Sequence, residues 1–232
     1  MGWRSSYLDI VINDYNIFSK EELENMDVYE FGVFTGDSMK EIASILSKHK
    51  IQVNSFYGFD VFTGMPKETA EKLPVEQTSW DPDIEPDAFN ALKRLGLGTV
   101  DECVDKISQE VINIFSRNNN KSPVKIFPGL VQETIQSNHG NFKPAFYVDF
   151  DMDIYSPTKY AFDYLAKNNL ITKGTIIGYD DWGGTTGYKE MLDGESRAHR
   201  EIVEQYGFQI RELFEIDCGP FNVQSIWIVE SV

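Results

Sequence analysis

Two strand-like segments separated by a glycine turn and an amphipathic helix constrain the fold of this chain most strongly. Residues 27–34 (DVYEFGVF) have the composition of a buried strand, and residues 37–50 repeat apolar side chains at helical spacing. Ser38 and Glu41 fit a capping box, so the helix is expected to start there. Residues 52–60 (QVNSFYGFD) alternate and are rich in β-forming residues. This order predicts a parallel βαβ unit with a right-handed crossover.

The same alternation of strands and helices resumes further along the chain. The sequence predicts strands at 122–129, 144–151, 174–182, 208–217 and 223–231, and helices at 130–138, 156–171 and 194–207. The last two strands are joined by the short segment CGPFN and therefore predict a hairpin. We expect residues 1–232 to form a single doubly wound, Rossmann-like α/β domain, with a mostly parallel sheet and an antiparallel hairpin at its C-terminal end.

Residues 63–122 interrupt this pattern. Their first part is rich in proline and acidic residues, and residues 99–119 have helical spacing of apolar side chains. Long connections within α/β domains often serve as lids or binding segments. We expect a helical lid or acceptor-binding insertion here, with a surface excursion of no special function as the alternative.

The charge and cysteine content restrict the partners of the protein. The chain has 37 acidic and 21 basic residues and a net charge of −16, which argues against a nucleic-acid partner. No stretch is apolar for the roughly 18 residues that a membrane-spanning helix needs, so no membrane partner is expected. Cys103 and Cys218 form no disulfide framework, which favours a cytoplasmic location. The apolar residues between Tyr7 and Ile12 could serve a homodimer interface or pack on their own domain.

Carboxylates follow four of the predicted strands. Glu30, Asp60, Asp151, Asp180 and Asp181 all lie at or just past predicted strand ends. Ligands of open α/β sheets bind at the carboxyl ends of the strands, near the point where the strand order reverses. The acids therefore indicate a binding site at that edge of the sheet.

The first glycine turn and the second strand together point to a nucleoside-containing cofactor. Gly32 and Gly36 would let the backbone approach a ligand closely, while Thr35 and Ser38 offer hydrogen-bond donors for an anion. An acid such as Asp60, at the end of the second strand, can accept both hydroxyls of a ribose. The glycine spacing differs from G-x-G-x-x-G, so NAD is disfavoured.

Four motifs in the order VYEFGVFTGDSM, YGFDVFTGMP, DMDIYSPT and IIGYDDWG give the chain a family resemblance. Together they resemble the macrocin O-methyltransferase family, class I S-adenosylmethionine (SAM) enzymes that methylate sugars on natural products. The resemblance covers residues 28 to about 183 and loosens within 67–122. It implies a small-molecule, carbohydrate-containing acceptor and SAM as the methyl donor.

The resemblance also implies a role for individual residues around the cofactor. Its implied SAM-binding set is Glu30, Gly32 and Gly36 at the methionine part, Thr35 and Ser38 at the carboxylate, Asp60 at the ribose and Gly129 at the adenine. Asp37 departs from the pattern, since the family commonly has another glycine there. We expect its side chain to point outward as a helix cap.

The resemblance further implies a divalent metal. Aligning Tyr155 and Thr158 with D-x-D-x-Y-x-x-T makes Asp151 the first metal ligand, with Asp180 and Asp181 as partners. These carboxylates have no evident basic partner in the sequence, and an ion such as Mg²⁺ would relieve their repulsion.

Asp151 is the candidate for the catalytic base as well as for a metal ligand. His139 is an alternative base, and Asp149 is expected to be a strand residue with a local partner. The sequence leaves open an N-acceptor or phosphate-bearing acceptor, and a non-catalytic SAM- or nucleotide-binding module.

Overall fold

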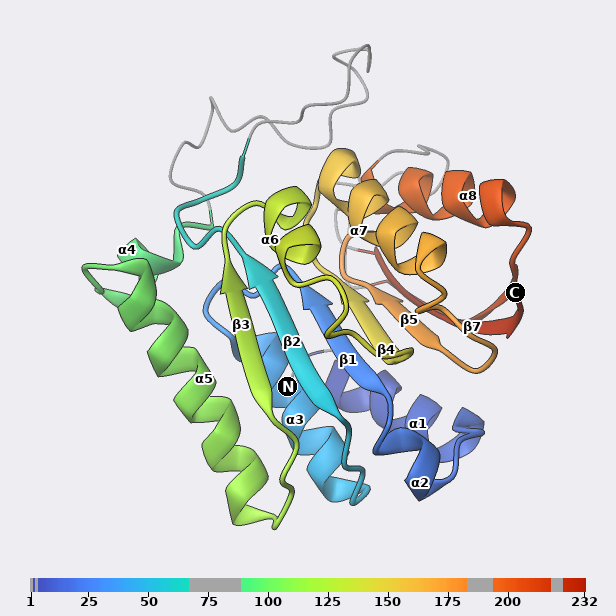
Figure 1. The fold of residues 1–232 in the computed structure, drawn as a ribbon, viewed down its shortest axis with the longest axis horizontal. Coiled ribbons are helices and arrows are strands. Elements are labelled where there is room, and N and C mark those ends of the chain that lie inside the picture. The colour runs from blue at the N-terminus through green and yellow to red at the C-terminus, as the bar shows by residue number, and fades with distance from the viewer. Residues whose placement is uncertain (1, 3, 67–88, 183–193, 218–222) are drawn as a thin grey trace.

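Seven strands form one sheet in the order β3-β2-β1-β4-β5-β7-β6 (Figure 1). The computed structural model describes residues 2, 4–66, 89–182, 194–217 and 223–232. The strands are β1 (Asp27–Phe31), β2 (Ser55–Asp60), β3 (Val124–Pro128), β4 (Ala145–Phe150), β5 (Ile176–Tyr179), β6 (Gln209–Asp217) and β7 (Val223–Ser231). The first five run parallel, whereas β7 pairs antiparallel with both β5 and β6. The predicted doubly wound sheet with a C-terminal antiparallel hairpin is confirmed.

Helices cover both faces of the sheet. The described helical segments are η1 (Arg4–Leu8), α1 (Asp9–Tyr15), α2 (Lys20–Leu23), α3 (Asp37–Lys48), α4 (Ala91–Leu95), α5 (Val100–Arg117), α6 (Val131–Ser137), α7 (Tyr155–Lys167) and α8 (Gly194–Tyr206). One buried cluster joins the N-terminal segment, α3 and α5 to the sheet, and a second joins α6, α7 and α8 to its other face (Figure 1). Within the described part of the chain, no helix is both long enough and apolar enough to span a bilayer.

The strand order reverses between β1 and β4, which lie side by side at the centre of the sheet. Glu30 of β1 is in register with Asp149 of β4, and Asp149 with Gly178 of β5. The loops that follow β1, β2, β4 and β5 therefore meet at one edge of the sheet. A reversal of this kind opens a crevice in which α/β proteins bind ligands.

Helix α5 belongs to the core of the fold. Cys103, Ile107, Val111 and Phe115 repeat at helical spacing, and each is at most 1% exposed. These side chains pack in the same cluster as α3. Helix α5 itself lies between β2 and β3 in the chain, as a crossover helix does. This half of the predicted 63–122 insertion is therefore a regular layer of the domain, while its residues 67–88 lie outside the described residues.

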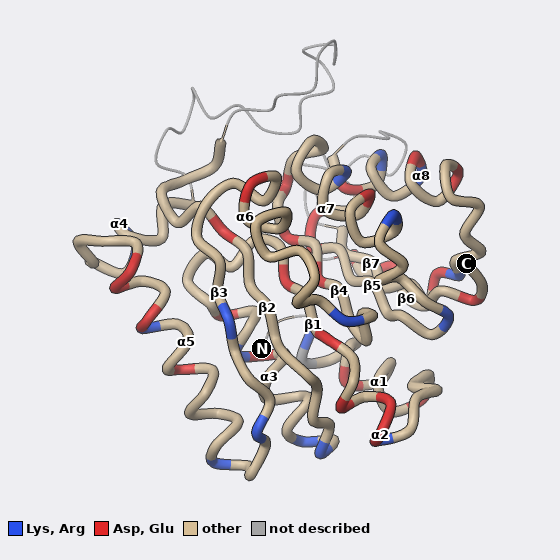
Figure 2. Tube along the Cα trace, in the orientation of Figure 1, with Lys and Arg blue, Asp and Glu red and all other residues tan. Residues whose placement is uncertain are grey.

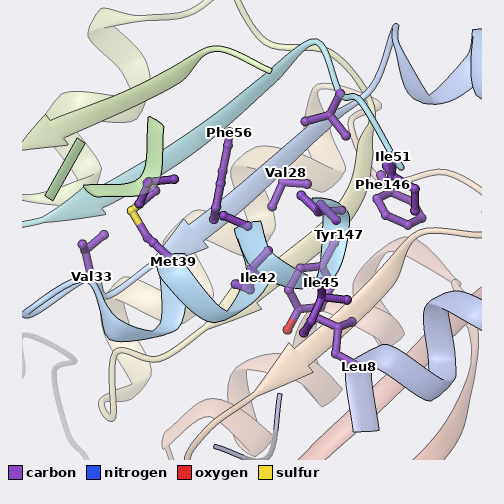
Figure 3. Packing of buried hydrophobic residues seen from close by; sticks show 14 of the residues in the cluster. Leu8, Val28, Val33, Met39, Ile42, Ile45, Ile51, Phe56, Phe146 and Tyr147 are labelled. Atoms are coloured by element: carbon purple, nitrogen blue, oxygen red, sulfur yellow. The ribbon is translucent and has the colours of Figure 1, made fainter. Parts of the chain in front are cut away.

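The N-terminal segment packs against its own chain. Leu8 and Val11 are fully buried in the cluster that also contains Ile45 and Tyr147 (Figure 3). This is the second of the two roles expected for the segment, although Ile10 keeps 42% of its surface exposed. The packing fixes η1 beside α3, and with it the side chain of Arg4.

Helix α3 begins earlier than its sequence suggested. It starts at Asp37, after Gly36 in the left-handed conformation with φ = 76° and no side-chain cap. The predicted capping box of Ser38 and Glu41 is wrong, because the Ser38 hydroxyl donates a 2.5 Å hydrogen bond to Glu30 instead. Because α3 follows the short turn after β1, the N-terminus of the helix lies at the carboxyl end of that strand.

Candidate functional site

A cavity of about 620 Å³ lies at the carboxyl ends of the central strands. Its lining includes eight of the residues singled out from the sequence, namely Gly32, Thr35, Asp37, Ser38, Asp60, Gly129, Asp151 and Asp180, whereas Glu30, Gly36 and Asp181 are not among the lining residues. The volume falls within the range of pockets that enclose a small organic ligand or cofactor. Figure 2 shows acidic positions gathered around this end of the sheet.

Gly32 brings the loop after β1 against the loop after β4. Its φ is +94°, and a Cβ atom at this position would lie 1.7 Å from the carbonyl oxygen of Asp151. The amide of Asp151 in turn donates to the carbonyl of Phe31 at 2.8 Å. The missing side chain of Gly32 therefore makes room for Asp151. Gly36 makes room for Ile107 of α5 in the same way, because a Cβ atom added to Gly36 would lie 2.4 Å from Ile107 Cγ2.

Asp60 binds the backbone of the glycine turn. Its Oδ2 accepts hydrogen bonds from the amides of Val33 at 2.7 Å and Phe34 at 2.8 Å, and its Oδ1 accepts one from Phe62 at 2.5 Å. Burial raises the pKa of the Asp60 carboxyl, while the backbone N–H groups oppose that rise. Phe34 and Phe62 have positive φ values of 47° and 59°, so both loops are held in conformations that side chains disfavour.

Glu30 is fully buried behind Ser38. Its Oε1 accepts the Ser38 hydroxyl, whereas its Oε2 is buried and has no hydrogen-bond partner within the described residues. Burial, with the nearby Asp149 charge, raises the pKa of Glu30 well above its ordinary value. A buried acceptor without a donor is costly, so this atom is a candidate contact for a donor group of a ligand, although Glu30 itself is not among the residues that line the cavity.

Asp37 has an exposed side chain that also lines the cavity, and the expectation that it caps the helix is wrong, because the N-cap of α3 is Gly36 without a side-chain cap. Its side chain is 80% exposed and pairs with Lys40 at 2.7 Å. It also accepts a hydrogen bond from the Thr35 hydroxyl at 2.9 Å. Lys40 therefore neutralises the carboxylate that the sequence placed next to the glycine turn.

Three carboxylates after β4 and β5 can converge on one ion. Oxygen atoms of Asp151, Asp180 and Asp181 lie within 4.8 Å of one another. Burial raises the pKa of Asp151 and of Asp181 well above the ordinary range, and the repulsion among the acids adds to the effect. Oxygen donors that repel one another fit a hard divalent cation such as Mg²⁺.

A basic partner for these acids comes from the N-terminal segment, although no basic partner was expected from the sequence. Arg4 is 6% exposed, and its Nε and Nη2 contact Oδ2 of Asp149 at 2.9 and 2.7 Å. The guanidinium also contacts Asp151 Oδ2 at 3.0 Å and Asp180 Oδ1 at 3.1 Å. Tyr147 donates to the other oxygen of Asp149 at 2.5 Å. Asp149 thus has the local partner that was expected, together with a distant one.

Glu195 of α8 joins the two acidic loops. It is fully buried and accepts hydrogen bonds from the amides of Met152 at 3.0 Å and Asp181 at 3.1 Å. Burial raises the pKa of Glu195 well above its usual value, with a further contribution from Asp181. Nothing in the sequence near residue 195 marks this role, because both of its partners are distant in the chain.

His139 lies in a different place from the acids. Its Nδ1 forms a 2.7 Å hydrogen bond with the hydroxyl of Tyr164. Both residues line a separate cavity of about 320 Å³ between α6 and α7. Of the two candidates for the base, only Asp151 lines the large cavity.

Comparisons with known proteins bear on the fold. No protein-family model matches the sequence, and a search of curated proteins finds no match. Among solved structures, the calicheamicin methyltransferase CalS11 is 18% identical over 94% of this chain and 74% of its own, with a TM-score of 0.59. The O-methyltransferase NovP is 16% identical over 98% of this chain and 79% of its own, with a TM-score of 0.63.

The fold is that of methyltransferases. A second CalS11 structure, described as a TDP-rhamnose 3'-O-methyltransferase, is 18% identical over 86% of this chain and 71% of its own, with a TM-score of 0.51. The likeness extends over nearly the whole chain, including the antiparallel pairing of β5, β7 and β6. At these identities it establishes the fold and leaves the chemistry to the residues of the site.

Proposed function

We propose that this protein is a SAM-dependent O-methyltransferase that acts, with a divalent cation such as Mg²⁺, on a hydroxyl group of a carbohydrate-containing small molecule. The observation that carries the proposal is one cavity, at the strand-order reversal of a methyltransferase fold, lined by both the glycine turn and the acids Asp151 and Asp180. The macrocin O-methyltransferase family, which the four sequence motifs resemble, remains our proposed family.

The proposed cofactor site lies on the β1 and β2 side of the cavity. Thr35 and Ser38, at the N-terminal end of α3, would bind the SAM carboxylate through their backbone N–H groups, since a helix N-terminus favours an anion and their hydroxyls donate to Asp37 and Glu30. Glu30, with its unpartnered Oε2, would receive the amino group, next to Gly32 and Gly36. The ribose would lie at Asp60 and the adenine at Gly129.

The proposed reaction centre lies on the β4 and β5 side. SAM, when bound, supplies an electrophilic methyl group, and a divalent cation held by Asp151, Asp180 and Asp181 would lower the pKa of the acceptor hydroxyl. Asp151 would take the proton from that hydroxyl as its oxygen forms the new bond to the methyl carbon and the sulfur–carbon bond breaks. Asp151 lines the cavity, as a base that must reach an acceptor hydroxyl there has to.

The acceptor class is supported by the structural neighbours. The CalS11 structure described as a TDP-rhamnose 3'-O-methyltransferase names a sugar nucleotide, and NovP is named an O-methyltransferase. The net charge of −16 fits a neutral acceptor better than nucleic acid. We also propose that the protein is cytoplasmic. A homodimer is the assembly that we propose to test.

The alternative is a non-catalytic module that binds SAM or a nucleotide. The convergence of Asp181 with Asp151 and Asp180 favours catalysis, because the Arg4 contacts described above account only for the latter two and SAM binding requires none of the three. An N-acceptor or a phosphate-bearing acceptor would use the same cavity.

Ligand-induced thermal shift separates these functions. SAM and S-adenosylhomocysteine should raise the melting temperature, whereas NAD should not. Asp151→Asn should abolish methyl transfer to a panel of sugar nucleotides and small glycans while SAM binding persists. Stabilisation by NAD alone would exclude the proposal, and a fully active Asp151→Asn variant would remove Asp151 from its role.

A further inference from the structure

Arg4 connects parts of the acidic site that the strands alone do not connect. Its Nε and Nη2 lie against Asp149 within β4, its Nη2 also reaches Asp151 just past β4, and its Nη1 reaches Asp180 just past β5. A guanidinium is planar and rigid, so these contacts fix the relative positions of the carboxylates. Two of the three acids are candidate metal ligands.

If Arg4 served only to neutralise Asp149, its contacts with Asp151 and Asp180 would not be needed. Tyr147 already donates to Oδ1 of Asp149, and the Nε and Nη2 contacts of Arg4 satisfy Oδ2. The Nη1 contact with Asp180 extends beyond that pair to the neighbouring strand. Because a carboxylate accepts at two oxygens, one contact to Arg4 does not exclude a metal bond at the other.

The position of Arg4 is set independently of the acids. On its N-terminal side, the amide of Gly2 donates to Glu41 of α3 at 2.7 Å. On its C-terminal side, Leu8 is fully buried, and Asp9 pairs with Lys48 at 2.6 Å. The guanidinium is therefore held in place from both sides by contacts with α3 and the core, and it can orient the more exposed Asp151 and Asp180, which are 28% and 22% exposed.

We propose that Arg4 is a positioning residue of the acidic site, which holds Asp151 and Asp180 in the arrangement in which they bind a divalent cation together with Asp181. This inference rests on the metal-binding part of the proposed function. It makes the N-terminal segment, which lies outside the sheet and its crossover helices, part of the active site.

A charge-balanced pair of substitutions tests the proposal. Arg4→Met combined with Asp149→Asn removes one positive and one negative charge, so the net charge near the metal site is unchanged and the buried Asp149 carboxylate is not left without its partner. Mn²⁺ alone serves as the probe, with its binding followed by electron paramagnetic resonance in the absence of SAM and acceptor. Removing the residues that orient metal ligands typically weakens metal binding by about 10- to 100-fold.

The double variant should bind Mn²⁺ at least about tenfold more weakly than the wild type, while its affinity for S-adenosylhomocysteine stays unchanged. Arg4→Lys, which keeps the charge and loses the planar fork, should also bind Mn²⁺ more weakly. The control Asp9→Asn, which loosens the same segment without touching the acids, should bind Mn²⁺ as the wild type does.

Two results would overturn the inference, and they differ in what else they exclude. If the double variant binds Mn²⁺ with wild-type affinity, Arg4 is only a structural partner of Asp149 and does not position the metal ligands. The proposed function would be unaffected. Failure of the wild type itself to bind Mn²⁺ would remove both the metal site and this role of Arg4, whereas binding of SAM would still stand.

Discussion

Replacing Gly32 by alanine should damage both the fold and the acidic site. The glycine has φ = +94°, and an added Cβ atom would lie 1.7 Å from the backbone carbonyl oxygen of Asp151, where real contacts start at 3.0 Å. A flexible side chain could move aside, but a carbonyl can only move with its backbone. The substitution must therefore push the loop after β4 away from the loop after β1.

The cost can be worked out from three contributions. A left-handed conformation costs an L-residue about 1–2 kcal/mol. Forcing extra atoms into a packed contact costs about 1–3 kcal/mol more. Two hydrogen bonds flank the contact, Gly32 N to Phe59 O at 2.9 Å and Asp151 N to Phe31 O at 2.8 Å, and weakening each costs about 1 kcal/mol. The total is about 4–7 kcal/mol, which lowers the melting temperature of a chain of this size by about 8–28 °C.

Gly140 provides a matched control. It has nearly the same φ, +93°, but nothing lies within 4 Å of an added Cβ. Gly140→Ala should therefore lose only the conformational contribution of about 1–2 kcal/mol. Thermal unfolding of both variants, with Mn²⁺ binding as a second readout, checks the reasoning. Equal melting temperatures and equal Mn²⁺ affinities would show that the contact of Gly32 with Asp151 does not matter.

Two further predictions concern the buried carboxyls. Burial raises the pKa values of Asp151, Asp181 and Glu195 in the folded protein, so these groups hold protons that the unfolded chain has already released. Their contribution to stability is present at low pH and is lost as the pH rises toward the raised pKa values. Burial lowers the pKa of His199 to about 3, so His199 makes the stability rise with pH, but only up to its unfolded pKa of about 6.5. The melting temperature of the metal-free protein should therefore fall as the pH rises from the unfolded carboxyl pKa values of about 4 toward the raised ones, with His199 opposing the fall up to pH about 6.5. Mn²⁺ should reduce that fall, and a steady rise would contradict this account. Glu195→Gln should cost about 1–3 kcal/mol, because its NH₂ group must face one of two backbone N–H donors, whereas Glu204→Gln, at an exposed position of the same helix, should cost less than about 1 kcal/mol in chemical denaturation. Equal losses for the two variants would remove Glu195 from its role.

The elements of the fold could be predicted because their signals are local. Strand composition, glycine turns and helical spacing each extend over a few residues, and their order determines a parallel, doubly wound sheet. Helix α5 was predicted as a helix within a segment expected to be a lid or acceptor-binding insertion. Its apolar face, with Ile107 and Phe115, looks the same in a lid as in a crossover helix, and only the packing against α3 separates the two.

The residues that line the site could be predicted from their positions at strand ends, whereas the residues that hold them in place could not. Asp151 and Asp180 follow predicted strands, so the sheet topology brings them together. Arg4 and Glu195 reach the same point from a helical turn and a helix that lie far away in the sequence. Neither carries a motif, because an ion pair or a bridging carboxylate imposes no spacing on the chain. The Ser38 capping box failed for a similar reason, since Glu30 competes for the hydroxyl.

The central claim, methyl transfer from SAM, is tested most directly with SAM that carries a labelled methyl group. The purified protein is incubated with labelled SAM and a panel of sugar nucleotides and small glycans, with and without Mg²⁺. We predict that label appears on an acceptor hydroxyl when Mg²⁺ is present and that the Asp151→Asn variant, tested in parallel, transfers none. Label transfer to no acceptor, from a protein that also fails to bind SAM or S-adenosylhomocysteine, would contradict the account.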